Sequence, residues 1–130
     1  MKNYVTDTHA LFWYLTHDKR LGRKANEAFQ KAAQGEAIIW IPTIVMAELF
    51  WILEKQDRTN VFFELFEKLE TAQQFEFIDF TITDVLLFEQ LASIPEMHDR
   101  IIASVAKKLD VPCLTKDEEI LQGNLVKTIW

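Results

Sequence analysis

The chain has 130 residues, of which 49% are hydrophobic, and its formal net charge is −6. The hydrophobic content excludes a disordered chain, and the presence of only three glycines and three prolines excludes collagen-like and linker-rich sequences. The acidic balance argues against nucleic-acid binding through bulk charge alone, and the length predicts one domain, residues 1–130.

Short apolar runs alternate with longer amphipathic segments along the chain. We predict strands at residues 3–6, 37–41, 75–80, 111–115 and 126–130. We predict helices at residues 8–15, 21–32, 43–55, 61–70, 81–92, 98–109 and 117–121. Asn60 is a candidate cap of the fourth helix, and Thr81 with Asp84 resembles a capping box before the fifth. This alternation is typical of an α/β domain with a parallel sheet.

Two observations predict a cytoplasmic location. Cys113 is the single cysteine and cannot form an internal disulfide, which suits a reducing compartment. The N-terminus reaches Asp7 before any apolar run forms, so we expect no secretion signal. The most apolar segment, residues 37–53, is shorter than the ~20 residues of a spanning helix and contains Glu48, so we expect no membrane span.

Glu48 is the one charged residue between Ile44 and Leu53. A helix that is apolar almost all round is mostly buried, and an unpaired carboxylate there costs several kcal/mol. Two interpretations carry equal weight on the pattern: Glu48 pairs with an arginine or lies where the helix reaches the surface, or it faces a cleft and a cation.

Three aspartates occupy places where ligands bind in open α/β sheets. Asp7 follows the first predicted strand, Asp117 follows the strand at residues 111–115, and Asp99 begins a helix. Each is alone more typical of a helix cap or a helix-dipole charge. If these aspartates and Glu48 meet at one edge of the sheet, they raise one another's pKa unless cations neutralise them. Oxygen ligands of this kind select Mg²⁺ or Mn²⁺.

The stretches YVTDTHALFW (residues 4–13), AEL (47–49), HDRIIA (98–103) and LTKDEEI (114–120) resemble the PIN domain. More narrowly, they resemble the ribonuclease toxins of VapC type from bacterial toxin–antitoxin pairs. The resemblance covers essentially the whole chain in order. It implies a three-layer α/β/α sandwich with a short, mostly parallel central sheet, and a single nuclease domain.

The resemblance also implies a site. Asp7, Glu48, Asp99 and Asp117 are the expected catalytic acids; Asp7, Asp99 and Asp117 are the expected metal ligands, and Thr115 supports them from behind. The implied activity is a Mg²⁺-dependent endoribonuclease, with Mn²⁺ as a substitute, in which an activated water attacks the phosphodiester. Glu48 or Asp117 then orients or deprotonates that water. The implied partners are an RNA substrate, an antitoxin protein and a second copy of the chain.

Other features leave alternatives open. The basic segment at residues 19–31 is either a solvated helix or a phosphate contact, and Arg100 and Lys116 are further phosphate candidates. The aromatic residues at positions 50–66 are either ordinary packing or a face for an antitoxin helix or a dimer. His9 and His98 fit surface or capping roles better than metal ligation.

Three alternatives to the toxin remain at this level. A PIN nuclease without an antitoxin has the same sequence features. A receiver module with an acidic Mg²⁺ pocket needs an acceptor aspartate after a middle strand, and here Asp79 falls inside the predicted strand. A non-catalytic interaction domain explains the acids as helix caps.

Overall fold

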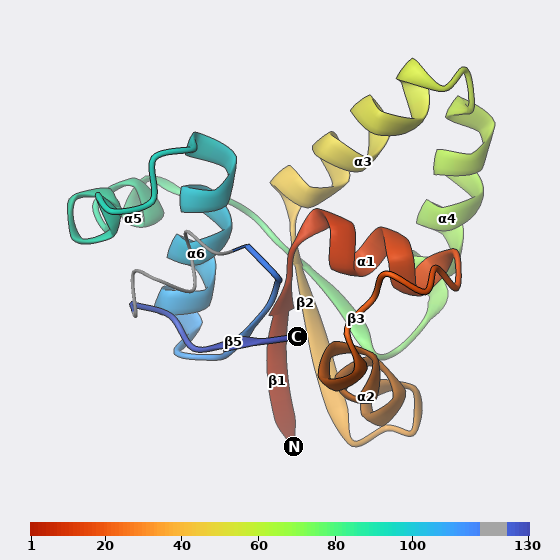
Figure 1. Ribbon diagram of the computed structural model, residues 1–130, viewed down its shortest axis with the longest axis horizontal. Helices are drawn as coiled ribbons and strands as arrows, with labels where there is room; N and C mark the ends of the chain where they lie inside the picture. Colours follow the sequence, from red (N-terminus) through yellow and green to blue (C-terminus); the bar gives the residue numbers. More distant parts are fainter. Residues whose placement is uncertain (118–124) are drawn as a thin grey trace.

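The computed structural model describes residues 1–117 and 125–130, and their strands form one sheet in the order β3-β2-β1-β4-β5 (Figure 1). The strands are β1 (Lys2–Thr6), β2 (Ala37–Pro42), β3 (Phe75–Ile78), β4 (Cys113–Leu114) and β5 (Thr128–Ile129). Every pair of neighbouring strands is parallel, so the predicted α/β class with a parallel sheet is confirmed. β3, β4 and β5 are shorter than predicted.

Helices cover both faces of the sheet, as a parallel sheet requires (Figure 1). The helices of the described residues are α1 (Thr8–Leu15), α2 (Arg23–Ala33), α3 (Thr43–Lys55), α4 (Thr59–Thr71), α5 (Ile82–Val85), the 3₁₀ helix η1 (Phe88–Leu91) and α6 (Met97–Leu109). α1 and α2 lie on one side of β1, and α5 and α6 lie on the other. α3 and α4 form a hairpin that projects beyond the carboxyl ends of the strands. None of the described helices is long and apolar enough to cross a membrane.

The centre of the sheet is the core of the molecule. Val5 of β1 and Ile39 and Ile41 of β2 are fully buried, and Leu114 of β4 completes this layer. Phe29 of α2 covers it from one side and stacks on Tyr14 with ring centroids 4.3 Å apart. Because the centre of the sheet is rigid and covered, the carboxyl ends of β1 and β4 are held at fixed positions.

Two predicted helix features are wrong. α4 begins at Thr59 with Arg58 as its cap residue, so Asn60 lies inside the helix rather than capping it. The helix predicted over residues 81–92 is divided into α5 and η1. The chain turns at this point through 3₁₀-type hydrogen bonds, such as that from the Leu87 N–H to the Asp84 carbonyl, because this places Leu91 in the core.

The helix predicted over residues 117–121 lies outside the described residues, apart from Asp117. The remaining predicted helices are confirmed, and those at residues 8–15 and 43–55 agree with the structure at both ends.

Asp84 forms a buried ion pair that the sequence pattern did not reveal. Its carboxylate is fully buried, accepts the Thr81 backbone N–H at 2.9 Å as in the predicted capping box, and lies 2.9 Å from the Lys108 ammonium. Lys108 reaches it from α6 and keeps 25% of its side chain exposed. The pair fastens α5 to α6, which carries Asp99.

This pair gives the first prediction. Replacing Lys108 by Met leaves the Asp84 carboxylate buried without a counter-charge, and we expect a loss of about 3–5 kcal/mol of unfolding free energy. The neighbouring Lys107→Met is the matched control and should change stability by less than about 0.5 kcal/mol. Urea unfolding of both variants measures the difference. Equal stabilities for the two variants would contradict the role given to Lys108.

Candidate functional site

Asp7 is the first acid of the site, and it directly follows β1. Its Oδ1 accepts a hydrogen bond from the Ala10 backbone N–H at 2.8 Å, so it caps α1. Burial raises the pKa of the Asp7 carboxyl, hydrogen bonds from Thr115 and Ala10 oppose the rise, and the nearby Asp117 carboxylate adds to it. Asp7 is therefore a helix cap that also lies beside a second carboxylate.

Thr115 joins Asp7 to Asp117. It follows β4 and is fully buried, and its hydroxyl oxygen accepts the Asp117 backbone N–H at 3.0 Å. The same side chain hydrogen-bonds the Asp7 carboxyl. Because β4 is paired with β1, the two strand ends and the acids that follow them lie side by side.

Asp99 reaches the same place from the first turn of α6. Its backbone N–H donates to the Glu96 carboxylate, which caps the helix, at 2.8 Å. The pKa of the Asp99 carboxyl rises to about 7. Burial is the largest cause, followed by the hydrogen bond and the charge of Asp117 and then by the charges of Glu96 and Glu48. Two carboxyl groups that share a hydrogen bond need a proton or a cation between them.

Glu48 comes from the second turn of α3. Its Oε1 accepts the Thr8 hydroxyl at 2.8 Å, so its partner is a threonine beside Asp7 and not an arginine. Its negative charge also contributes to the raised pKa values of Asp99 and His98. An arginine partner is therefore excluded for Glu48, which is half-buried, and that it faces a cation stays a prediction.

Cys113 lies within reach of the charges of three of these acids. Its thiol is fully buried, and burial raises its pKa well above the ordinary value. The charges of Asp7, Asp99 and Asp117 add to that rise, so all three act on one buried sulfur atom. We call Asp7, Glu48, Asp99 and Asp117 the carboxylate cluster.

The structure gives other candidates different roles. His98 lies beside the cluster, and its ring Nδ1 is 2.6 Å from Glu96, whose hydrogen bond raises the pKa of the imidazole. Arg100, a candidate phosphate contact in the sequence, donates to the backbone carbonyl of Ile94 and so holds the segment before α6.

Sequence reasoning did not find Thr8 or Glu96, which hold Glu48 and the start of α6 respectively. Glu96 had a local signal, because an acid three residues before Asp99 fits a helix cap. Thr8 had none, since its partner is 40 residues away in the chain.

The chemistry of the cluster fits a hard divalent cation. Its donors are carboxylate oxygens, which suit Mg²⁺ or Mn²⁺, and the raised pKa of Asp99 reports like charges that a cation would neutralise. Within residues 1–117 and 125–130, no three acidic, histidine or cysteine side chains are gathered closely enough around one point to hold a metal ion. Mutual repulsion opposes a closer approach of such carboxylates.

Comparison with known proteins identifies the family. The model of the PIN domain family matches residues 4–123, and the chain belongs to that family. A search of curated proteins finds no match.

Three solved structures share the fold. A VapBC complex from Salmonella typhimurium bound to DNA has a TM-score of 0.74 at 15% identity and covers 98% of this chain and 97% of its own. VapBC2 from Rickettsia felis, bound to a DNA fragment from its promoter, has a TM-score of 0.70 at 18% identity, with coverages of 97% and 96%. FitAcB from Neisseria gonorrhoeae has a TM-score of 0.65 at 20% identity, with coverages of 96% and 95%.

The crowding at Asp99 gives the second prediction. In the folded chain Asp99 keeps a proton up to about pH 7, whereas in the unfolded chain it loses it near 3.8. Between these two pH values the folded state binds more protons than the unfolded state. In metal-free buffer the contribution of Asp99 to the free energy of unfolding is therefore full below pH 3.8 and is lost as the pH rises through 7. Asp99→Asn should reduce this loss of stability with rising pH and raise the melting temperature by a few degrees at neutral pH.

Thermal unfolding in a chelating buffer over this pH range is the measurement. Asp57→Asn, at the exposed turn between α3 and α4, is the control and should keep the wild-type pH dependence. An unchanged pH dependence in Asp99→Asn would show that Asp99 is not crowded by the other acids.

Proposed function

We propose that this PIN-domain chain is a Mg²⁺-dependent endoribonuclease and the toxin of a toxin–antitoxin pair. The observation that carries the proposal is the meeting of four acids from four different elements at one edge of the sheet, with Asp99 and Asp117 in contact. Membership of the PIN family supports nuclease chemistry at that cluster. A cap role alone explains Asp7 but leaves unexplained why Asp99 and Asp117 share one hydrogen bond.

Within this proposal, Asp7, Asp99 and Asp117 hold the metal ion. Thr115 keeps two of them in place, because its hydroxyl bonds both the Asp7 carboxyl and the Asp117 backbone. When bound, Mg²⁺ supplies a water of lowered pKa and polarises a phosphate oxygen. No histidine is required by this chemistry.

Glu48 takes the role of the proton acceptor. The hydrogen bond from Thr8 fixes Oε1, and Oε2 then accepts a proton as water attacks the phosphorus. The bond from phosphorus to the 3′ oxygen breaks, so one product ends in a 5′-phosphate and the other in a 3′-hydroxyl. The 2′-hydroxyl takes no part.

The third prediction concerns this chemistry. Wild-type protein should cleave single-stranded RNA with Mg²⁺ or Mn²⁺, lose the activity in EDTA, and leave 5′-phosphate ends. Glu48→Gln should lower the rate by about 10²–10⁴-fold, the usual value of a general base, and Asp7→Asn should abolish cleavage. Glu54→Gln, on the exposed part of α3, is the matched control and should keep full activity.

Gel-resolved cleavage with analysis of the product ends makes the measurement. Folding of each variant is checked by circular dichroism. Cleavage that persists in EDTA, or products that end in a 2′,3′-cyclic phosphate, would exclude the proposed mechanism. If wild type cleaves nothing and Asp7→Asn unfolds, Asp7 is only a cap.

For the antitoxin, we propose the projecting hairpin of α3 and α4 as the docking face. Trp51 and Phe63 are 60% and 61% exposed, and the rings of Phe62 and Phe66 continue the aromatic surface between them and the sheet. An exposed aromatic surface of this kind suits the apolar face of a partner helix. The structural neighbours from Salmonella typhimurium and Rickettsia felis are VapBC complexes, which supports a protein partner. We propose the homodimer implied by the sequence resemblance as well.

The fourth prediction tests this face. We expect the product of an adjacent small reading frame to co-purify with the chain and to inhibit cleavage. Each of Trp51→Ser and Phe63→Ser should weaken that complex by about 30-fold or more, because a buried aromatic anchor contributes about 2 kcal/mol or more, and the double variant should weaken it by about 10³-fold. Ile82→Ser with Leu86→Ser removes a still more exposed apolar pair, at the start of α5 and at its C-cap, and is the control. Titration calorimetry measures both; greater weakening in the control pair would place the partner on α5.

A further inference from the structure

A groove rich in lysine lies between α2 and the β1–β5 side of the sheet. Its volume is about 490 Å³, and its walls include Lys24 and Lys31 of α2, Lys2 of β1, and Lys127 just before β5. None of the residues of the carboxylate cluster lines it. The sequence marked residues 19–31 as basic, but only the fold brings Lys2 and Lys127 beside that segment.

The charge of this groove is unbalanced. Glu27 is the one acidic side chain among its described lining residues, and it already pairs with Arg23 at 3.2 Å. Across residues 1–117 and 125–130, none of the four groove lysines forms an ion pair, and all four are exposed. Four close ammonium groups on a chain of net charge −6 attract a polyanion locally, although the whole chain does not.

The groove extends toward the carboxylate cluster. Its lining includes Trp130, and the Ile129 carbonyl beside it accepts the Thr115 backbone N–H at 3.2 Å, which places the end of β5 level with the acids. Lys2 and Asp7 are five positions apart on β1, a span of about 16 Å at the rise of a strand. The groove therefore begins at the amino ends of the strands and ends near the site.

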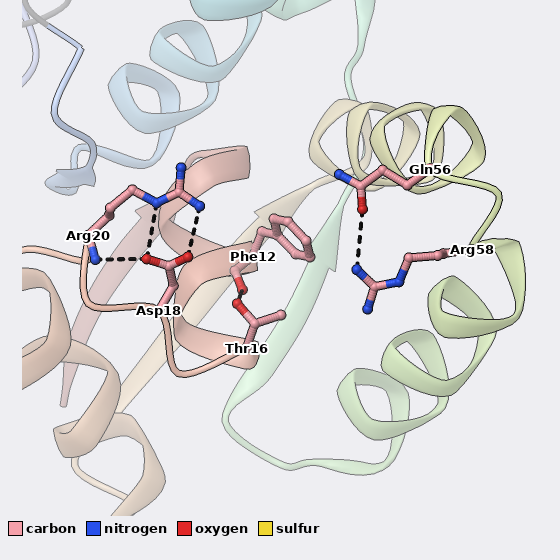
Figure 2. Close-up of polar contacts among 6 residues, drawn as sticks. All are labelled: Phe12, Thr16, Asp18, Arg20, Gln56 and Arg58. Carbon is pink, nitrogen blue, oxygen red and sulfur yellow. Dashed lines mark hydrogen bonds and ion pairs between the residues drawn. The ribbon is translucent and has the colours of Figure 1, made fainter.

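Basic groups continue between the groove and the acids. Trp130 packs edge-on against Trp13, with ring centroids 5.9 Å apart. The Lys116 ammonium and the Arg20 guanidinium both make cation–π contacts with Trp13, each 4.7 Å from a ring centroid. Figure 2 shows how Asp18 holds Arg20, accepting its Nε at 3.1 Å and its Nη2 at 2.8 Å. Lys116 adjoins Asp117 in the chain, so positive charge reaches the edge of the cluster.

Figure 2 also shows the turn between α3 and α4, where Arg58 donates a hydrogen bond to Gln56 at 3.2 Å. The groove lysines belong to α2, to β1 and to the residue before β5, whereas the exposed rings proposed for the antitoxin belong to α3 and α4.

We propose that the lysine groove binds the phosphates of single-stranded RNA and leads the strand to the carboxylate cluster. This inference rests on the proposed ribonuclease function and adds the path of its substrate. Lysine ammonium groups bind phosphates as point charges, without sequence preference. A groove of about 490 Å³ lies in the size range of small-ligand sites and has room for nucleotides of a single strand.

The fifth prediction is a binding experiment in EDTA, where metal-dependent cleavage cannot interfere. A short fluorescent single-stranded RNA is titrated with the full chain over a series of salt concentrations. Lys24→Gln with Lys31→Gln should weaken binding and reduce the slope of log K against log salt by about 1.4, or 0.7 for each lost phosphate contact. Both lysines are exposed, so folding should be unchanged in thermal unfolding.

Lys55→Gln with Lys68→Gln is the matched control, because it removes the same charge from exposed positions of α3 and α4. Its slope and affinity should equal those of wild type. The groove assignment is overturned if the Lys24 and Lys31 variant keeps the wild-type slope, if the control pair loses as much, if the chain binds no RNA, or if duplex DNA of equal length competes equally well.

The outcomes separate this inference from the proposed function. If wild type cleaves RNA with Mg²⁺ while the Lys24 and Lys31 variant binds and cleaves normally, the groove assignment fails and the nuclease stands. If RNA binding depends on these lysines but no metal restores cleavage, the groove assignment stands and the nuclease fails.

Discussion

The repulsion between carboxylates at the carboxyl edge of the sheet is the constraint around which this structure is organised. Asp99 and Asp117 share a hydrogen bond although both are acids, and the pKa of Asp99 rises to about 7 as a result of burial and its charged neighbours. Such an arrangement opposes folding unless the elements that carry the acids are held firmly from elsewhere. The parallel pairing of β1 with β4, the buried Thr115 and the Asp84–Lys108 ion pair do this here.

The order of the elements followed from local patterns, and the reasons are visible in particular residues. The apolar run of β2 is buried on one face and half-buried on the other, so its composition indicated a strand covered by helices on both sides. The division of the helix at residues 81–92 could not be predicted, because it depends on Lys108 reaching Asp84 from 24 residues away and on the need to bury Leu91. Tertiary contacts of this kind override helix propensity.

The candidate site, like the fold, could be predicted from the sequence only in part. The positions of Asp7 and Asp117 after strands indicated that they lie at a ligand-binding edge, and the sheet order places them on neighbouring strands β1 and β4. For Glu48, the pattern showed only that a charge interrupts an apolar helix. Its orientation depends on the Thr8 hydroxyl, and no periodicity within α3 contains that information. The roles of these residues as catalysts and metal ligands remain proposals that the family supports.

On the proposed function, the opposed charges of the molecule explain how an acidic chain would act on a polyanion. A carboxylate cluster alone repels RNA, so a nuclease built on it needs positive charge nearby, arranged so that the substrate is held without neutralising the acids. The lysine groove provides this charge, and its far end lies well away from the acids: Lys2 is five positions before Asp7, a span of ~16 Å, which is beyond the Debye length of about 8 Å at physiological salt. Lys2 therefore attracts phosphates without neutralising the acids. Lys116 and Arg20 lie over the Trp13 ring, between the lysine groove and the carboxylate cluster. An RNA strand bound in the groove would pass these two side chains before it reached the acids.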